Sequence, residues 1–184
     1  VEVASLGVQV HGGMGFIEET GAASLLRDAR IAPIYEGTNG IQAIDLVTRK
    51  LPQSDGAQIA GYIAELRGVE QELRQSNLPG LGRSADRLAE ALDAVQEATC
   101  FLLAAQGKGR QQEALAGATP YLRLFGLAAG GVYLAKAALA DGKDPRIALC
   151  RFFAENLIGE TVALKNSVIG GAESLSEAAA TLVA

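Results

Sequence analysis

The sequence has little of what metal and nucleophilic catalytic sites are built from. Its 184 residues include one histidine, His11, and two cysteines, Cys100 and Cys150. A single histidine excludes a multi-histidine metal site and makes a serine or cysteine triad improbable. We interpret Glu18 and Glu19 as loop charges and predict no metal site. Both thiols fall in apolar helical patterns, so we predict reduced core residues and a reducing, cytoplasmic compartment.

An excess of positive charge and a long uncharged run are also missing. The formal net charge of -5 gives no basic field for nucleic acid, so no such partner is expected. The uncharged apolar stretch between Arg123 and Lys136 has about a dozen residues against the ~20 that a bilayer requires. We predict no membrane span there but a buried helix, in which Gly126 and Gly130 would permit close packing.

Because the chain opens with neither Met nor a signal-like segment, we expect a fragment of a longer polypeptide.

Strand signals are nearly absent. Alternation of period two is not sustained, and apolar residues recur at spacings of three and four, which predicts an all-α fold. The segment from Pro52 to Gly56 combines a proline, a glycine and the capping candidates Ser54 and Asp55. It predicts two domains, residues 1–52 and residues 53–184.

The second predicted domain contains four long helical segments, which short links would join into an up-and-down four-helix bundle. Thr119-Pro120 and Asp144-Pro145 each place a capping side chain before a proline, and Gly170 fits a stop signal. The last segment has the clearest apolar seam. The expected ranges are approximately 55–75, 84–106, 119–140 and 144–169.

The first predicted domain alternates short helices with glycine- and proline-containing connections. A helix is expected to end near Val10, and the glycine-rich stretch 11–16 predicts a turn. A second helix, from about Gly21, should stop before Pro33. After the connection 34–38, helix should resume near Asn39 and run to about residue 51.

Two features of this domain could carry chemistry. The glycine-rich stretch follows no strand, so taken alone it is a tight interhelical turn, although it would also admit a phosphate or ring against the backbone. A lone glutamate such as Glu36 is usually a solvated surface charge. Between Tyr35 and Gly37 in an apolar loop, however, its carboxylate could face a partly dry cavity, where it would be a stronger base at neutral pH.

The first predicted domain contains three motif blocks, Gln9–Phe16, Arg27–Ile31 and Ile34–Asn39. In order and in spacing they resemble the C-terminal signature of acyl-CoA dehydrogenases. The rest of the chain is similar, with less specificity, to the helical domain appended in long bacterial members of that family. Ser24 and Gly40 depart from the common pattern, at an ion-pair position and near the flavin. Arg27 and Asp28 match it, and a surface or intersubunit ion pair is at least as plausible for them as direct catalysis.

The resemblance implies a role for each matched residue. Glu36 matches the family's base, which removes the α-proton of an acyl-CoA thioester while hydride leaves the β-carbon for the flavin of FAD, giving the 2,3-enoyl-CoA. Gly37 would let the thioester lie against the loop. Free N–H groups where helix resumes could receive a phosphate oxygen. The cofactor-binding matches are Gln9, Gly12 and Gly13 toward the FAD of a neighbouring subunit, and Thr38 and Asn39 toward the FAD of the same subunit.

The resemblance also implies an electron-acceptor flavoprotein as partner and a homo-oligomer, dimer or tetramer. Because the family's N-terminal helical and central β-domains are not encoded here, the chain alone is expected to be inactive. One alternative is a noncatalytic helical module for oligomerisation or partner binding. Another is a bundle that binds a small ligand through Thr99 or Thr161, although helical hydroxyls usually bond a backbone carbonyl.

Overall fold

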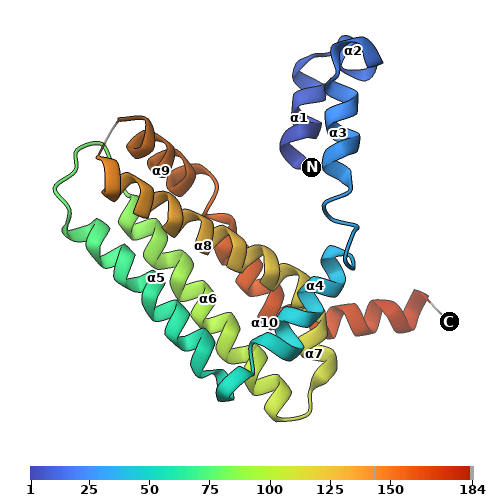
Figure 1. Cartoon of the computed structure of the whole chain (residues 1–184). Helices are drawn as coiled ribbons and strands as arrows, with labels where there is room; N and C mark the ends of the chain where they lie inside the picture. The colour runs from blue at the N-terminus through green and yellow to red at the C-terminus, as the bar shows by residue number, and fades with distance from the viewer. Residues whose placement is uncertain (143, 183–184) are drawn as a thin grey trace. The chain divides into compact units, whose positions relative to one another are not determined.

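The computed structural model describes residues 1–142 and 144–182, and the regular secondary structure of these residues is helical throughout (Figure 1). The predicted all-α fold is therefore confirmed. The chain divides into two compact units, Val1–Gln42 and Ala43–Ala184. This division falls upstream of the boundary that Pro52 predicts, because Ala43, Val47 and Leu51 belong to the core of the second unit.

The first unit is a helical hairpin. Helices α1 and α3 lie side by side and are joined at one end by α2 and the short η1 (Figure 1). The predicted turn is present at His11 and Gly12, but the glycine-rich stretch then continues as the short helix α2. The elements are α1 (Glu2–Val10), α2 (Gly13–Phe16), η1 (Glu18–Thr20), α3 (Ala22–Arg30) and the beginning of α4 (Asn39–Asp45).

The second unit is a bundle built around two long helices. Helices α6 and α8 pack against each other, α5 and α10 each contact both, and α9 lies along α8 and α6. The end of α4 leads into the π-helical η2, and α7 links α6 to α8. The elements are η2 (Leu46–Lys50), η3 (Gln53–Gly56), α5 (Ala57–Gln75), α6 (Ser84–Gly107), α7 (Gln111–Ala116), α8 (Ala118–Asp141), α9 (Asp144–Asn156) and α10 (Glu160–Leu182).

The predicted continuous helix over 144–169 is wrong, because the chain breaks between α9 and α10. At the break Ile158 takes the buried position in place of Leu157, because Ile158 is 1% exposed and Leu157 is 45% exposed. The predicted stop at Gly170 is wrong as well. Neither Gly170 nor Gly171 adopts the left-handed conformation of a helix end, and α10 continues to Leu182.

Two predicted helix caps are also wrong. Helix α5 begins at Ala57 after Gly56, because Ser54 and Asp55 both have a φ of 54° and are not helical. Helix α8 begins one residue before Thr119, with no capping side chain. The predicted start of α9 at residue 144 is observed, but its capping side chain lies outside what the structure describes.

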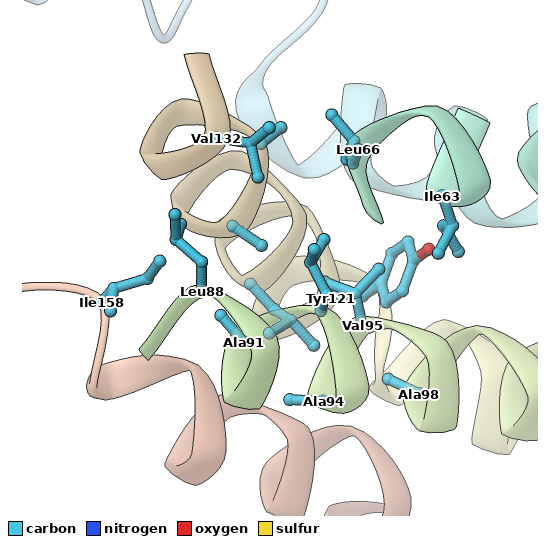
Figure 2. Packing of buried hydrophobic residues seen from close by; sticks show 14 of the residues in the cluster. Ile63, Leu66, Leu88, Ala91, Ala94, Val95, Ala98, Tyr121, Val132 and Ile158 are labelled. Atoms are coloured by element: carbon cyan, nitrogen blue, oxygen red, sulfur yellow. The ribbon is translucent and has the colours of Figure 1, made fainter. Parts of the chain in front are cut away.

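The bundle core is built mainly from packed hydrophobic side chains (Figure 2). The few polar side chains buried among the described residues all have hydrogen-bond partners. The hydroxyls of Thr99 and Tyr121 are 2.7 Å apart, and Thr99 also donates to the Val95 carbonyl at 2.7 Å. Burial raises the pKa of Tyr121 to about 12. Thr161 donates to the Ile158 carbonyl at 2.7 Å. Thr99 and Thr161 thus donate to backbone carbonyls, as expected for helical hydroxyls.

The two cysteines differ in their exposure to solvent. Cys150 is buried as predicted, but Cys100 is exposed on α6, so its assignment to the core is wrong.

Among the described residues, α8 is long and apolar enough to cross a membrane by length and composition. A core helix of a bundle needs the same composition, and nine residues of α8 are buried. The absence of a membrane span therefore stays a prediction.

Helix α9 is fixed to the α5–α6 loop by Glu155. Its carboxylate accepts a hydrogen bond from the Arg83 backbone N–H and others from the Arg151 guanidinium, all at 3.1 Å. These bonds lower the pKa of Glu155, the Arg83 bond most strongly. A Cβ on Gly82, which has a φ of 53°, would lie 2.3 Å from the Glu155 carboxylate. The loop therefore requires glycine there.

Close packing of α8 depends on Gly131, and not on the glycines that the sequence suggests. A Cβ on Gly131 would lie 2.7 Å from Ile158 Cδ1 and 2.9 Å from Leu88 Cδ2. At Gly126 and Gly130 an added Cβ would meet nothing within 4 Å, so the prediction for them is wrong. Figure 2 shows Ile158 and Leu88 near the α8 backbone.

We expect Gly131→Leu to lower the free energy of unfolding of the chain by about 1–3 kcal/mol, because the core there is already filled. Gly130→Leu is the matched control on the same helix and should leave stability equal or higher, since leucine has the better helix propensity by under ~1 kcal/mol. Urea denaturation followed by circular dichroism measures both. Equal destabilisation by the two variants would contradict the assignment.

Candidate functional site

The loop between α3 and α4 presents Glu36 in an unusual backbone conformation. Glu36 has a φ of 55° and Gly37 a φ of 84°, so two successive residues are left-handed. Such a conformation costs energy for a residue with a Cβ and is found mainly where the surrounding structure holds it. It gives the chain a sharp change of direction just before α4, with Glu36 at the bend.

Hydrogen bonds on both sides of Glu36 hold this bend. The Tyr35 N–H donates to the Ile31 carbonyl at 3.1 Å, and the Asn39 N–H donates back to the Pro33 carbonyl at 3.1 Å. The Gln42 side chain donates from Nε2 to the Glu36 carbonyl at 2.8 Å. The Glu36 backbone is thus tied to the first turns of α4.

The Glu36 side chain is exposed in this chain. Its carboxylate takes part in no hydrogen bond or ion pair in the described part of the chain. The other residues of the first unit therefore do not build the partly dry cavity expected around it. A carboxylate with no intramolecular partner is available to a substrate, but any exclusion of water must come from other protein segments.

The residues that follow Glu36 leave little side-chain bulk beside it. A Cβ on Gly37 would lie 3.2 Å from Ile41 Cγ2, and its φ disfavours any other residue. Thr38 Oγ1 is 3.4 Å from the Ile41 nitrogen, and its carbonyl accepts the Gln42 N–H at 3.0 Å. Thr38 and Asn39 lie at the start of α4 and are exposed.

The other group of predicted site residues lies at the turn between α1 and α2. Gly12 has a φ of 61° and a ψ of -143°, a conformation almost confined to glycine, and its N–H donates to the Gln9 carbonyl at 3.0 Å. A Cβ on Gly13 would meet nothing within 4 Å. The backbone of the turn is therefore open to a close approach.

Gly15 is a structural requirement of this turn that the sequence did not single out. A Cβ there would lie 2.2 Å from the Val8 carbonyl oxygen and 2.9 Å from His11 Cβ. Because one neighbour is backbone, the clash cannot be relieved by a side-chain rotation. Spacing alone gave no sign that Gly15, and not Gly13, is the residue packed against α1.

The two groups lie at opposite ends of the α1–α3 hairpin (Figure 1). The turn of Gln9, Gly12 and Gly13 is at the end closed by α2, whereas Glu36 follows the far end of α3. With 1.5 Å per residue, the nine residues of α3 separate them by roughly 13 Å. The structure therefore does not gather the predicted residues into one cluster.

Arg27 forms an ion pair within the chain. Its guanidinium donates to both Glu18 oxygens at 2.9 Å. The hydrogen bond from Arg27, together with its charge, lowers the pKa of Glu18. Both side chains are more than 60% exposed, so the ion-pair interpretation of Arg27 agrees with the geometry. No group of three or more potential metal-ligating side chains occurs among the residues described.

Most apolar side chains of the first unit are uncovered. Ala22 is its one buried apolar side chain among residues 1–42. A groove of about 470 Å³ runs between α1 and α3, lined by Val3, Gly7, Leu25 and other residues. Burial of apolar surface is the main stabilising contribution to folding, so this unit on its own receives little of it. The strongly exposed apolar residues include Val3, Leu6, Val10, Phe16 and Leu25.

We therefore expect hydrogen exchange to separate the two units. Amides of α1 and α3 should exchange at least about 100-fold faster than those of α6 and α8, because local opening of the first unit exposes little new apolar surface. Mass spectrometry of the intact chain after deuterium labelling measures this. Comparable protection in α1 and α6 would show that the first unit is stable without a covering partner.

Comparisons with known proteins agree with the sequence blocks. Residues 1–51 match the family model "Acyl-CoA dehydrogenase, C-terminal domain". Residues 57–179 match the model "Acetyl-CoA dehydrogenase C-terminal like".

Three similar proteins have names that state an enzyme activity or a complex. A 3-methylmercaptopropionyl-CoA dehydrogenase of Ruegeria pomeroyi is 42% identical over 186 residues, covering 95% of the chain and 31% of that protein. The broad-specificity linear acyl-CoA dehydrogenase FadE5 of Mycobacterium tuberculosis is 38% identical over 106 residues, 54% of the chain and 16% of that protein. The caffeyl-CoA reductase-Etf complex subunit CarC of Acetobacterium woodii is 44% identical over 41 residues, 22% of the chain and 11% of that protein.

The chain thus spans about a third or less of the length of these relatives. The two family models together account for most of its residues, and one of them alone covers more than half. The chain belongs to the acyl-CoA dehydrogenase family, of which it represents C-terminal segments.

Proposed function

We propose that this chain is the C-terminal part of an FAD-dependent acyl-CoA dehydrogenase that oxidises an acyl-CoA thioester to the 2,3-enoyl-CoA, with Glu36 as the base. The observation that carries the proposal is the conformation of Glu36. An exposed carboxylate, without a hydrogen-bond or ion-pair partner among the described residues, is held on a left-handed backbone in the segment that resembles the family's catalytic stretch.

In this proposal Glu36 takes the α-proton of the thioester. A carboxylate is a suitable base when it lies within hydrogen-bond reach of the proton and when water is excluded around it. The fixed bend supplies the orientation, and Gly37 leaves space beside the carboxylate for the thioester. The remainder of the parent enzyme would supply the walls of the acyl pocket.

The open backbone at the α1–α2 turn is compatible with part of an FAD site. Gly12 and Gly13 present backbone that no Cβ covers, so a pyrophosphate or ring could approach closely. With Gln9 they would face the FAD of a neighbouring subunit, whereas Thr38 and Asn39 would face the FAD of their own subunit. The roughly 13 Å between the two ends of α3 supports two separate cofactor contacts. When bound, FAD supplies the acceptor for the hydride that leaves the β-carbon.

The proposal includes partners and a location. An acyl-CoA is the substrate, an electron-transferring flavoprotein is the electron acceptor, and the enzyme is a homodimer or homotetramer in the cytoplasm. The open apolar surface of the first unit supports association, because a surface of this kind is normally covered. The name of CarC, which places it in an Etf complex, supports the choice of electron acceptor.

We expect the 184-residue chain alone neither to retain FAD nor to oxidise acyl-CoA, because it has only part of each site. Flavin absorbance after gel filtration of the chain mixed with FAD measures retention. Dye reduction with a saturated acyl-CoA measures turnover. Flavin that co-elutes with the chain, or dye reduction above the protein-free rate, would contradict the expectation.

In the complete enzyme, Glu36→Gln should lower kcat by about 10²–10⁴-fold, the range that a positioned general base contributes. FAD content should stay unchanged, because the amide keeps the size of the side chain. Stopped-flow reduction of the flavin by acyl-CoA measures the chemical step directly.

The matched control is Glu19→Gln, the same change at an exposed glutamate near η1. It should reduce flavin at the wild-type rate. Undiminished reduction in Glu36→Gln would refute the assignment of the base and favour the noncatalytic helical module.

A further inference from the structure

We propose that Gln42 is a positioning residue, whose side chain holds the Glu36 backbone in the conformation that aims the carboxylate. This inference rests on the proposed role of Glu36 as the base. Gln42 lies in α4, six positions after Glu36, and no cofactor or substrate role has been assigned to it above.

The contact is specific in geometry. Gln42 Nε2 donates to the Glu36 carbonyl oxygen at 2.8 Å, a normal distance for an N–H···O bond. The Gln42 backbone is itself fixed, because its N–H donates to the Thr38 carbonyl at 3.0 Å within the first turn of α4. The side chain therefore reaches back from a regular helix to the bend that precedes it.

The hydrogen bond from Gln42 acts on Glu36, the residue of the loop whose backbone conformation is energetically least favourable. Glu36 is one of three residues other than glycine with a positive φ among those described. A residue in this conformation relaxes to a right-handed or extended one unless its surroundings oppose the change. Any such relaxation would rotate the Glu36 carbonyl away from Gln42, so the hydrogen bond opposes it.

The same rotation would move the carboxylate. The direction of the Cα–Cβ bond of Glu36 is fixed by its φ and ψ, so a change in either swings the side chain away from a bound thioester. Misplacement of a catalytic group by about 1 Å is sufficient to lower a rate by about 10²-fold. Gln42 would thus act on the chemical step without contact with the substrate.

The chemistry of the contact requires a hydrogen-bond donor at position 42. A carbonyl oxygen accepts only from a donor, and of the side chains with the length of Gln, neither Met nor ionised Glu has one. Ile41, the neighbouring residue, packs its side chain against Gly37 instead. One turn of α4 therefore supports the bend by an apolar contact and by a hydrogen bond.

The experiment uses the complete enzyme and the variants Gln42→Met and Gln42→Glu. Both should lower kcat by about 10- to 100-fold, with KM within about threefold and FAD content unchanged. The kinetic isotope effect with an α-deuterated acyl-CoA should increase, because proton abstraction becomes more rate-limiting. Gln71→Met, the same substitution at an exposed α5 residue, is the matched control and should behave as wild type.

The pH dependence separates positioning from general destabilisation. Protonated Glu regains an O–H donor, so the deficit of Gln42→Glu relative to wild type should decrease as the pH falls toward the ordinary range of a glutamic acid, near 4.3. The deficit of Gln42→Met should not change with pH. A parallel response of the two variants would overturn the hydrogen-bond role.

The remaining outcomes are distinguishable. If Glu36→Gln abolishes flavin reduction while both Gln42 variants keep kcat within twofold, the base assignment stands and the role of Gln42 is refuted. If Glu36→Gln remains active, the proposed function itself fails. Loss of folded enzyme or of FAD in both Gln42 variants would give Gln42 a structural role and would also overturn the proposal.

Discussion

The packing of α6 against α8 is the interaction on which the rest of the second unit depends. Helices α5, α9 and α10 all pack on this pair, and its core is almost wholly apolar. Gly131 lets Leu88 and Ile158 approach the α8 backbone, and the hydrogen bond between Tyr121 and Thr99 satisfies the hydroxyls between the two helices. The break before α10 places Ile158 in the core, where its side chain fills the space beside Gly131.

The first unit differs from the second because it has almost no apolar core of its own. Its helices form a hairpin but bury almost no apolar side chain within the unit, while the two turns that carry the predicted site residues contain residues in left-handed conformations. Residues in such conformations are kept at functional sites when surrounding contacts hold them. Around Glu36 those contacts come from the backbone of the loop and from Gln42, so the proposed base would be oriented before a substrate arrives.

Sequence patterns predicted the ranges of α5, α6 and α8 to within a few residues, although Thr99 interrupts the apolar stripe of α6. They failed on the continuity of the last segment, which has the clearest seam, and on several local glycine signals. Gly170 is a good stop signal by composition, but α10 continues through it. Likewise Gly126 and Gly130 have the spacing of a packing motif, while the glycine in contact is Gly131.

The sequence by itself determined the all-α class, because no strand period is present, and it indicated Glu36 through three blocks at family spacing. Only the tertiary structure decided how that residue is held. A hydrogen bond from Gln42 to a backbone carbonyl, and a positive φ at a residue other than glycine, have no signature in residue type or period. Both depend on where the chain turns after α3, which is set by three-dimensional contacts and not by local preference.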